Sequence, residues 1–437
     1  MEKKIIQVED KVPFRLLVPL SIQHMFAMFG ASVLVPFIFG INPAIVLFTN
    51  GVGTLLFILI TKGKAPAYLG SSFAFLAPAG IVIAKWGYSY ALGGFVVVGL
   101  CGGILAFIIY KFGTKWIDIV LPPAAMGPVV ALIGLELAGS AASTAGILKT
   151  TSYTLDKATG LYSQTVTPVA MNAFLVFLIT LCVAVFGNVL FKKFLSVIPV
   201  LIAIIAGYVS AIFLDVISMD TIREALSSPL FSIPEFQLPH FQLDAILIIL
   251  PVILVIASEH IGHQVVTSKI VGRDLLKDPG LHRSLFADNF STMLSGLVGS
   301  VPTTTYGENI GVMAMTKVYS VRVIAGAAIL SILCSFIGPM SALINTIPGP
   351  VIGGISFLLY GMIGTSGIRI MVDAKVDYSK SRNLTLTSVV FVTGLSGAAI
   401  TLGDVELKGM VLACIVGMIL SLLFYIFDKL KLTNDRD

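Results

Sequence analysis

The sequence predicts an all-α protein that crosses a membrane many times, and three observations support this. The 437-residue chain is 57% hydrophobic with a mean hydropathy of +0.98, and only 12% of its residues are charged. Soluble globular proteins carry about 25% charged residues. The apolar residues fall into segments of roughly the 20 residues that a helix needs to span a bilayer. Lysine and arginine gather in alternate connections between these segments.

Fourteen apolar segments can be counted along the chain. They lie near residues 15–37, 43–61, 66–84, 91–110, 117–138, 169–191, 195–214, 242–268, 284–299, 303–317, 323–344, 347–368, 383–402 and 406–427. With the N-terminus in the cytoplasm, 23 of the 28 basic residues fall on the inner side and five on the outer side. This agrees with the positive-inside rule and predicts that both termini are cytoplasmic.

The remaining features of the chain indicate no soluble domain. The charged start shows no cleavable signal pattern. Two longer outer connections, 139–168 and 215–241, are predicted to be loops with short surface helices. All four cysteines lie inside apolar runs without metal or disulfide spacing, so we expect them to pack as small hydrophobic residues.

The fourteen segments divide into two sets of seven, and an odd number requires the second set to be inverted in the membrane. Three pairs of short motifs share an offset of seven segments. The pairs are Ile22-Gln23-His24 with Ser258-Glu259-His260, Gly70-Ser71-Ser72-Phe73 with Thr305-Tyr306-Gly307-Glu308, and Leu121-Pro122-Pro123 with Ile347-Pro348-Gly349-Pro350. We therefore predict two inverted repeats.

Segments 3 and 10 are interrupted by polar residues, glycine and proline at corresponding positions. Such a pair is typical of the binding site of a transporter. Each is predicted to be a short extended piece followed by a half-helix, the second becoming helical from about Glu308. The free N–H groups at the two helix starts would then point at a solute near the membrane midplane.

Three ionisable side chains are placed near this point. Glu259 and His263 are four residues apart, which puts them on one face of segment 8. Glu308 lies at the start of the second half-helix, and Asn309 and Tyr306 beside it offer neutral hydrogen-bonding groups. An ionisable residue at membrane depth indicates a functional site. Carboxylates beside an imidazole can exchange protons, so the sequence predicts a proton-coupled site.

Several neighbours have a structural interpretation of equal or greater weight. His260 lies roughly 100° round the helix from Glu259 and is expected to pack, as is the side chain of Tyr306. Gln23 and His24 either support the site or contact the solute, and Phe73 is either a core aromatic or a wall of the cavity. Asp288 and Asn289 are expected only to bridge segments.

No phosphate loop, HExxH, nucleophile elbow or CxxC pair is present, so we expect movement of a solute and no enzyme activity. A sensing receptor would need a cytoplasmic output domain, and about ten residues follow the last segment. An open channel is the remaining alternative, and saturable, gradient-coupled uptake would exclude it.

Tyr306-Gly307-Glu308-Asn309-Ile310-Gly311-Val312, followed by Thr316-Lys317, resembles the signature of the nucleobase–ascorbate transporters. Ile22-Gln23-His24 and Ser258–His263 resemble two further motifs of that family. The resemblance extends over essentially the whole chain and is greatest to the bacterial uracil-transporting branch, because Glu308 stands where purine carriers usually have glutamine.

The resemblance implies a fold with core and gate domains, in four stretches. The core would comprise 1–116 and 239–345, and the gate 117–238 and 346–437. It implies that Glu259 and Glu308 bind uracil, that His263 is linked to the proton, and that backbone near Phe73 and Gly307 lines the site. Ala31 and Tyr306 would lie nearby, with Gln23, His24, Ser72 and Asn309 in support.

The sequence thus predicts a uracil importer driven by proton symport, located in the bacterial cytoplasmic membrane and implied to be a homodimer. Besides uracil, its expected partners are membrane lipids; no nucleic acid, metal or cofactor is expected. Sodium stays open as the coupling ion, since only the absence of a carboxylate–hydroxyl–carbonyl cluster favours the proton. The alternatives are a purine or xanthine carrier and, with two glutamates against it, an anion transporter of the same architecture.

Overall fold

The computed structural model describes residues 5–148, 150–155, 162–167, 169–192, 195–403 and 405–433. Within them every predicted apolar segment coincides with at least one helix. Three two-stranded antiparallel sheets complete the fold. The expected all-α class is therefore confirmed, with short strands as additions.

One group of helices packs around α14 and α3, with α5 and α16 as their main neighbours. Its members are α1 (Phe14–Ala27), α2 (Phe29–Phe39), α3 (Pro43–Ile60), α4 (Leu76–Trp86), α5 (Tyr88–Phe112), α12 (Leu243–Ile249), α13 (Val252–Val271), α14 (Leu281–Val298), α15 (Gly307–Thr316) and α16 (Val321–Ser335). The short helices η1 (Phe73–Phe75) and η3 (Leu276–Gly280) belong to the same group.

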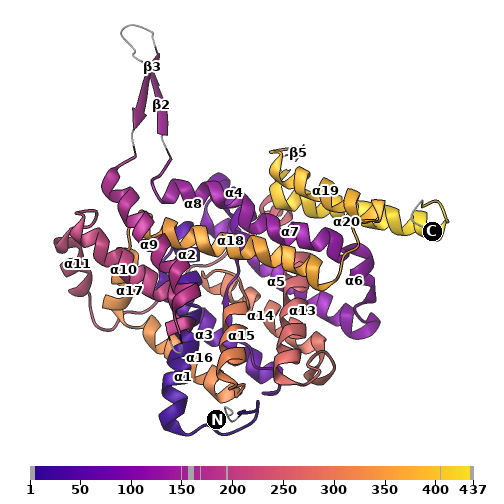
Figure 1. Cartoon of the computed structure of the whole chain (residues 1–437), viewed down its shortest axis with the longest axis horizontal. Coiled ribbons are helices and arrows are strands. Elements are labelled where there is room, and N and C mark those ends of the chain that lie inside the picture. Colours follow the sequence, from indigo (N-terminus) through magenta and orange to yellow (C-terminus); the bar gives the residue numbers. More distant parts are fainter. Residues whose placement is uncertain are drawn as a thin grey trace.

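A second group packs around α18, which lies against α7 and α9 and crosses the centre of Figure 1. Its members are α7 (Pro123–Glu136), α8 (Ala138–Thr144), α9 (Met171–Leu190), α10 (Pro199–Phe213), α18 (Gly349–Asp373), α19 (Ser381–Leu395) and α20 (Gly409–Lys429). The remaining connecting helices are α6 (Lys115–Val120), η2 (Leu195–Val197), α11 (Met219–Leu226) and α17 (Gly338–Asn345).

Local sequence explains where the helices begin and end. Asn42 accepts the Ala44 N–H at 3.0 Å and so caps α3, with Pro43 in the first turn. Gly272 ends α13 with φ +75°, a conformation that glycine adopts without strain. Glu136 at the end of α7 accepts the Met410 N–H at 3.0 Å and thereby satisfies one free donor at the start of α20.

Small residues let the helices approach closely. A Cβ on Gly102 of α5 would overlap the side chain of Asn289 on α14, and a Cβ on Gly367 of α18 would overlap the backbone of Ala131 on α7. Helices in membranes associate through such close contacts, because lipid supplies no hydrophobic drive between them.

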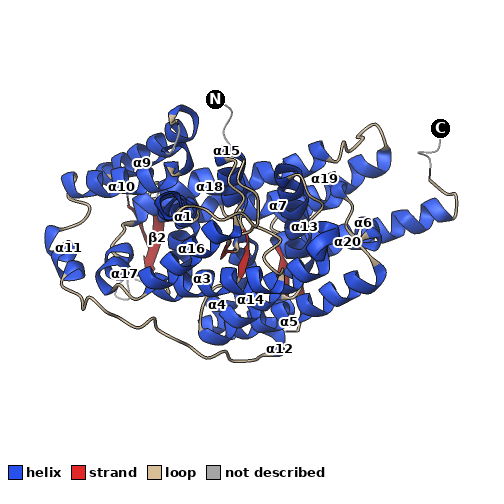
Figure 2. Cartoon of the chain, turned by 90° about the horizontal axis from the view of Figure 1, so that it is seen from below, coloured by secondary structure: helices blue, strands red, loops and turns tan. Residues whose placement is uncertain are grey.

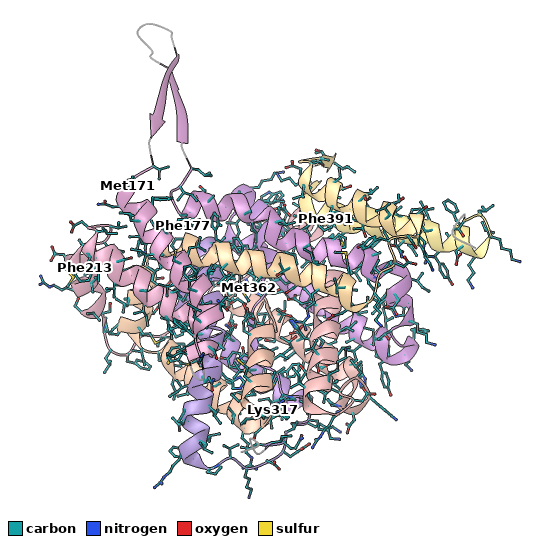
Figure 3. The ribbon with its side chains drawn as sticks, in the orientation of Figure 1. Met171, Phe177, Phe213, Lys317, Met362 and Phe391 are labelled. Atoms are coloured by element: carbon teal, nitrogen blue, oxygen red, sulfur yellow. The ribbon has the colours of Figure 1, made fainter. Side chains whose placement is uncertain are left out.

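The described chain contains eight helices that are long and apolar enough to cross a membrane. Three shorter apolar helices, Phe73–Trp86, Pro199–Phe213 and Val321–Ser335, accompany them. Large apolar side chains cover the outside: Phe213 is 82% exposed and Met171 67% exposed, and both project from the periphery in Figure 3. A multi-pass membrane protein accounts for this surface, since lipid covers it at no cost.

The two longer connections differ in part from the expectation. The first contains the short helix α8, and the second contains α11, as predicted. The first also forms a hairpin of β2 (Thr150–Leu155) and β3 (Tyr162–Thr167), which projects from the body in Figure 1 and was not predicted. A second hairpin, β5 (Ala399–Leu402) with β6 (Val405–Lys408), precedes α20. Residues 156–161 lie outside the described chain.

A two-stranded ribbon lies at the centre of the molecule (Figure 2). β1 (Leu69–Ser71) pairs antiparallel with β4 (Thr303–Thr305), with Gly70 opposite Thr304. Both strands are buried, and helices begin directly after each of them. The two predicted extended pieces therefore come from distant parts of the sequence and pair with each other.

The N-terminal residues form a strap that joins two helix ends. The Ile6 N–H donates to the Lys317 carbonyl at 3.0 Å, just after α15, and the Tyr319 N–H donates to the Ile6 carbonyl at 2.8 Å. Glu9 pairs with Arg273 at 2.5 Å, just after α13. The strap thus links the ends of the two helices that carry the predicted acids.

Candidate functional site

α13 carries the first acid and the histidine of the predicted site. Glu259 and His263 are partly exposed, whereas Ser258, His260 and Gln264 between and beside them are buried. Glu259 and His263 thus share one helix face, as their spacing of four residues predicts, and neither side chain is fully buried.

α15 begins with the second acid. Tyr306 precedes the helix, no side chain caps the helix start, and Gly307, Glu308 and Asn309 form its first turn. Backbone N–H groups in a first turn have no partner within the helix. Gly307 is exposed and Glu308 partly exposed, although Tyr306 and Asn309 are buried. The start of α15 is therefore accessible at Gly307 and Glu308.

The two helices bring the predicted ionisable groups together. α13 packs against α15 and β4. A Cβ built on Gly307 would lie 3.5 Å from the His263 Nε2. The carboxyl of Glu259 interacts electrostatically with those of Asp288 and Glu308. Glu259, His263 and Glu308 thus converge beside the exposed helix start.

The β1 side of the ribbon contributes backbone and an aromatic ring. The Ser72 N–H donates to the Pro302 carbonyl at 2.8 Å, which extends the pairing by one residue. Phe73 follows as the first residue of η1 and is partly exposed. Its ring meets Tyr360 of α18 edge-on, with centroids 6.4 Å apart. Tyr360 belongs to the other group of helices, and sequence reasoning gave no signal for it.

The supporting residues lie in the scaffold. The Asn309 amide donates to the His24 carbonyl at 2.8 Å and lies 3.1 Å from the His24 Nδ1, which ties α15 to α1. Gln23 is buried beside it on α1. Ala31 is buried in a cluster with Tyr68 and Tyr306.

Tyr306 is a scaffold residue, as the sequence indicated. Its side chain is only 5% exposed, and a Cβ on Gly70 would lie 2.8 Å from its ring. The ring therefore packs against the one residue of β1 that has no side chain. Only its neighbour Gly307 opens to the site.

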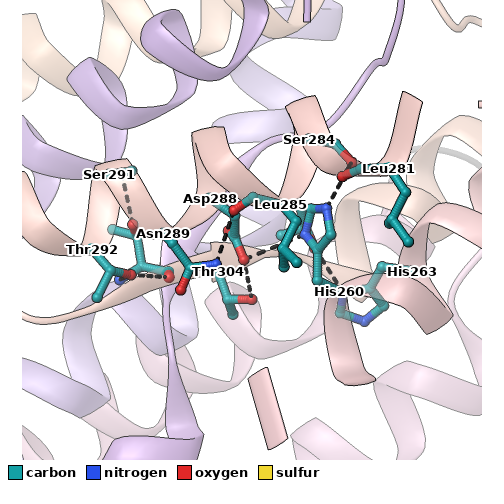
Figure 4. A network of polar contacts seen from close by, with 12 residues as sticks. His260, His263, Leu281, Ser284, Leu285, Asp288, Asn289, Ser291, Thr292 and Thr304 are labelled. Carbon is teal, nitrogen blue, oxygen red and sulfur yellow. Dashed lines mark hydrogen bonds and ion pairs between the residues drawn. The ribbon is translucent and has the colours of Figure 1, made fainter. Parts of the chain in front are cut away.

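A row of buried polar side chains lies behind His263. His263 Nδ1 lies 3.0 Å from the Thr305 Oγ1, and the same oxygen lies 3.4 Å from the His260 Nδ1. His260 continues to Asp288 at 3.3 Å and to Ser284 at 3.0 Å (Figure 4). His260 and Asp288 are fully buried, and their contacts join α13, α14 and β4, as expected for a packing histidine and a residue that bridges segments.

Several buried polar atoms near the ribbon have no partner among the described residues. They are the Ser71 and Ser72 Oγ, the Tyr306 hydroxyl and the Asn309 Oδ1. Buried polar groups are normally hydrogen-bonded, so such atoms point to bound water or a polar ligand. No group of three metal-ligating side chains was found in the described chain.

Two cavities, of about 300 and 470 Å³, lie elsewhere in the structure. Both are lined by Tyr110 and His282, whose rings lie 4.7 Å apart, and by other residues of α5 and α14. None of the predicted site residues borders them.

Solved structures with a similar fold come from other transporters. The transmembrane domain of the cyanobacterial bicarbonate transporter BicA aligns with a TM-score of 0.60, covering 95% of this chain and 100% of that one at 18% identity. The inward-facing murine anion transporter Slc26a9 aligns with a TM-score of 0.70, covering 96% and 69% of the two chains at 11% identity. At these identities the likeness concerns the fold alone.

Proteins found by sequence comparison share a much higher identity with this chain than these structures do. The chain is 50% identical to a uracil permease of Paenibacillus larvae subsp. larvae over 435 residues, which cover 100% of both chains. It is 50% identical to a uracil permease of Escherichia coli K12 over 431 residues, covering 99% of this chain and 96% of that one. Residues 15–403 match the family model described as Permease family (Xan_ur_permease). The chain therefore belongs to this family of permeases.

Proposed function

We propose that this permease carries uracil into the cell by proton symport. The observation that carries the proposal is the full-length similarity, at 50% identity, to two proteins named uracil permease. The convergence of Glu259, Glu308 and His263 beside an exposed helix start supports the same conclusion. Catalysis is not part of the proposal, because permeases move their substrate unchanged.

The chemistry of uracil matches the groups at the site. Uracil has two N–H donors and two carbonyl acceptors. The carboxylates of Glu259 and Glu308 accept from the N–H groups, and first-turn N–H groups near Gly307 and Phe73 donate to the carbonyls. Tyr306 and Ala31 form the wall behind these hydrogen-bonding groups. Gln23, His24, Ser72 and Asn309 support the helices and strands that carry them.

The proposed selectivity follows from these hydrogen bonds. A site built to bond polar groups rejects analogues that lack them, since its own groups are then left unpaired. A xanthine or other purine carrier is the main alternative. Competition by unlabelled xanthine against labelled uracil separates the two, because a uracil carrier keeps its uptake in the presence of xanthine.

The architecture proposed for transport has fourteen spans in two inverted repeats. The antiparallel pairing of β1 with β4, each leading into a helix, supports inversion. We assign residues 1–116 and 239–345 to a core domain, and 117–238 and 346–437 to a gate domain. The packing of helices into groups around α14 and α18 supports this division.

The proposed cycle couples uracil to a proton through the site. Uracil is neutral at physiological pH, so a titrating protein group must carry the charge. Protonation among Glu259, His263 and Glu308 favours the outward, uracil-binding form. The core then moves against the gate, and loss of the proton inside releases uracil. We place the protein in the bacterial cytoplasmic membrane as a homodimer.

Uracil uptake into proteoliposomes tests this function. We expect saturable uptake that accumulates uracil only when the inside is alkaline, and that persists when potassium replaces sodium. Accumulation without a proton gradient would overturn proton coupling, and a requirement for sodium would assign the coupling to that ion. The His263→Ala variant should lose gradient-driven accumulation, while Asp118→Asn, an exposed acid on α6 far from the site in sequence, should retain it.

A further inference from the structure

A groove of about 470 Å³ lies between α5 and α14, which pack side by side (Figure 2). On α5 it is lined by residues at helical spacing: Gly103, Ala106, Phe107 and Tyr110. From Gly103 to Tyr110 this lining extends over about 10 Å of helix. The volume falls within the range of about 300–1,000 Å³ that is usual for ligand pockets. We refer to this cavity as the α5–α14 groove.

The two ends of the α5–α14 groove differ in chemistry. At the apolar end, a Cβ on Gly103 would lie 3.5 Å from the ring of Phe286 on α14. At the basic end, His282 and Arg283 join the lining from the first turn of α14. The His282 ring lies there 4.7 Å from the ring of Tyr110. A ligand that matches both ends has a hydrocarbon part and an anionic part.

Arg283 supplies the positive charge of the basic end. Its side chain is half-buried, and it forms no hydrogen bond or ion pair with another of the described residues. The acid that precedes it in the sequence, Asp278, is instead paired with Lys64 at 2.7 Å. Lys111 at the end of α5 adds a second positive charge, since its Nζ lies 5.8 Å from the centre of the Phe107 ring. A guanidinium without a carboxylate partner is well suited to bind a phosphate group.

The groove opens toward lipid, with its basic end at the membrane surface. α5 is long and apolar enough to cross a membrane, and Tyr110 lies in its last turns. Phe107 is 60% exposed and Tyr110 61% exposed, as expected for side chains that contact lipid. The positive-inside rule assigns the basic connections 111–115 and 269–283 to the cytoplasmic side. The lipid leaflet on that side is negatively charged and attracts basic residues.

We propose that the α5–α14 groove binds an anionic phospholipid of the cytoplasmic leaflet. One acyl chain lies along Gly103, Ala106 and Phe286. The phosphate accepts hydrogen bonds from the Arg283 guanidinium beside His282. A free phosphate ion would leave the apolar length of the groove empty, and an uncharged head group would leave Arg283 without a partner. The proposal goes beyond uracil transport, because it involves none of the residues of the predicted uracil site.

Two pairs of variants separate charge from shape. Arg283→Gln removes the guanidinium. Arg322→Gln is its matched control, because Arg322 is an exposed arginine in the first turn of α16 and does not line the groove. Gly103→Leu fills the apolar end, whereas Gly103→Ala adds one methyl group at an ordinary contact distance from Phe286. The arginine pair still decides the question if Gly103→Leu fails to fold.

The readout is the lipid that stays bound to the purified full chain in detergent, measured by native mass spectrometry. Phosphatidylglycerol and phosphatidylcholine are added in equal amounts. We expect the wild type to bind phosphatidylglycerol about fivefold more tightly, the factor that one basic residue contributes near an anionic lipid. Arg283→Gln should lose this preference, and Arg322→Gln and Gly103→Ala should keep it. Gly103→Leu should weaken the binding of both lipids.

An unchanged preference in Arg283→Gln would overturn the inference, as would an equal loss of preference in Arg322→Gln. Equal binding of both lipids by the wild type would also overturn it. Glycerol phosphate is a third probe, since it carries the phosphate but no acyl chain. We expect phosphatidylglycerol, and not glycerol phosphate, to raise the melting temperature of the wild type. Equal stabilisation by the two compounds would assign the groove to a free phosphate compound and exclude the lipid.

Discussion

β1 and β4 each contribute three residues to the central ribbon, and in each half a helix begins two residues after the strand ends. Their side chains differ. The first half continues with Ser72, Phe73 and Ala74, whereas the second continues with Tyr306, Gly307 and Glu308. The backbone is thus repeated, but only the helix start that follows β4 carries a carboxyl group, that of Glu308.

The same asymmetry holds for the helices that flank the ribbon. α1 offers the neutral Gln23 beside His24, and α13 offers Glu259 beside His260. His24 holds Asn309, while His260 holds Asp288. Both halves therefore supply a helix start with free backbone donors, but the two carboxyl groups of the predicted site come from the second half. The following predictions test this division.

The largest effect is expected at the acids of the second half. Glu259→Gln and Glu308→Gln each replace a charged acceptor with a neutral amide, which should weaken uracil binding about 10- to 100-fold, or about 1.5–3 kcal/mol. Isothermal titration of uracil into the purified protein measures this. Asp118→Asn serves as the exposed control. Wild-type affinity in either glutamine variant would remove that residue from the site.

Gly70 in β1 and Gly307 at the start of α15 should respond differently to alanine. At Gly70 a Cβ would lie 2.8 Å from the Tyr306 ring, so Gly70→Ala should destabilise the fold by about 1–3 kcal/mol. At Gly307 the nearest atom is the His263 Nε2 at 3.5 Å, so Gly307→Ala should fold normally and weaken uracil binding. Thermal unfolding and titration separate the two outcomes. Equal loss of stability in both would contradict the assignment of frame and site.

A smaller effect is expected where the second half is anchored to the first. Asn309→Ala removes the bond to the His24 carbonyl at 2.8 Å inside the core, and should cost about 0.5–1.5 kcal/mol. Asn383→Ala is the matched control, because the Asn383 amide donates to the Asp377 carbonyl at 2.9 Å on the surface. A larger drop in melting temperature for the exposed asparagine would show that the link between α15 and α1 is unimportant.

The smallest effect is expected at the N-terminal strap. In this strap, the hydrogen bond from Arg273 lowers the pKa of Glu9 below its ordinary value of about 4.5. The pair therefore stabilises the folded state above pH about 4.5, and this stabilisation is lost as the pH falls through the lowered pKa. Both side chains are about half exposed, which limits the contribution to at most about 0.5 kcal/mol. Glu9→Gln should lower the melting temperature slightly at pH 7 and not at pH 3. An equal drop in melting temperature at both pH values would show that the charge of Glu9 is not the cause of the destabilisation.

Much of the fold could be predicted because hydropathy and helix or strand preference depend on residues that are neighbours in the sequence. The apolar segments, the extended pieces before Phe73 and Glu308, and the shared face of Glu259 and His263 need only one helix or strand at a time. The resemblance of the Tyr306–Val312 motif then indicated the family, which the match over residues 15–403 confirms.

The polar row could not be predicted because it depends on three elements at once. Thr305 meets His260 across 45 residues, and Thr304 and Asp288 face each other only through the register of β4 against α14. His260 was interpreted as a packing residue because it lies roughly 100° round α13 from Glu259. Tyr360 was missed for the same reason, since it reaches Phe73 from α18.

A structure determined with uracil bound tests the central claim most directly. We predict uracil beside the start of α15, with its N–H groups within about 3.2 Å of the Glu259 and Glu308 carboxylates and its ring near Phe73. Uracil bound elsewhere, for example in the cavity lined by Tyr110 and His282, or bound without contact to either carboxylate, would contradict the account.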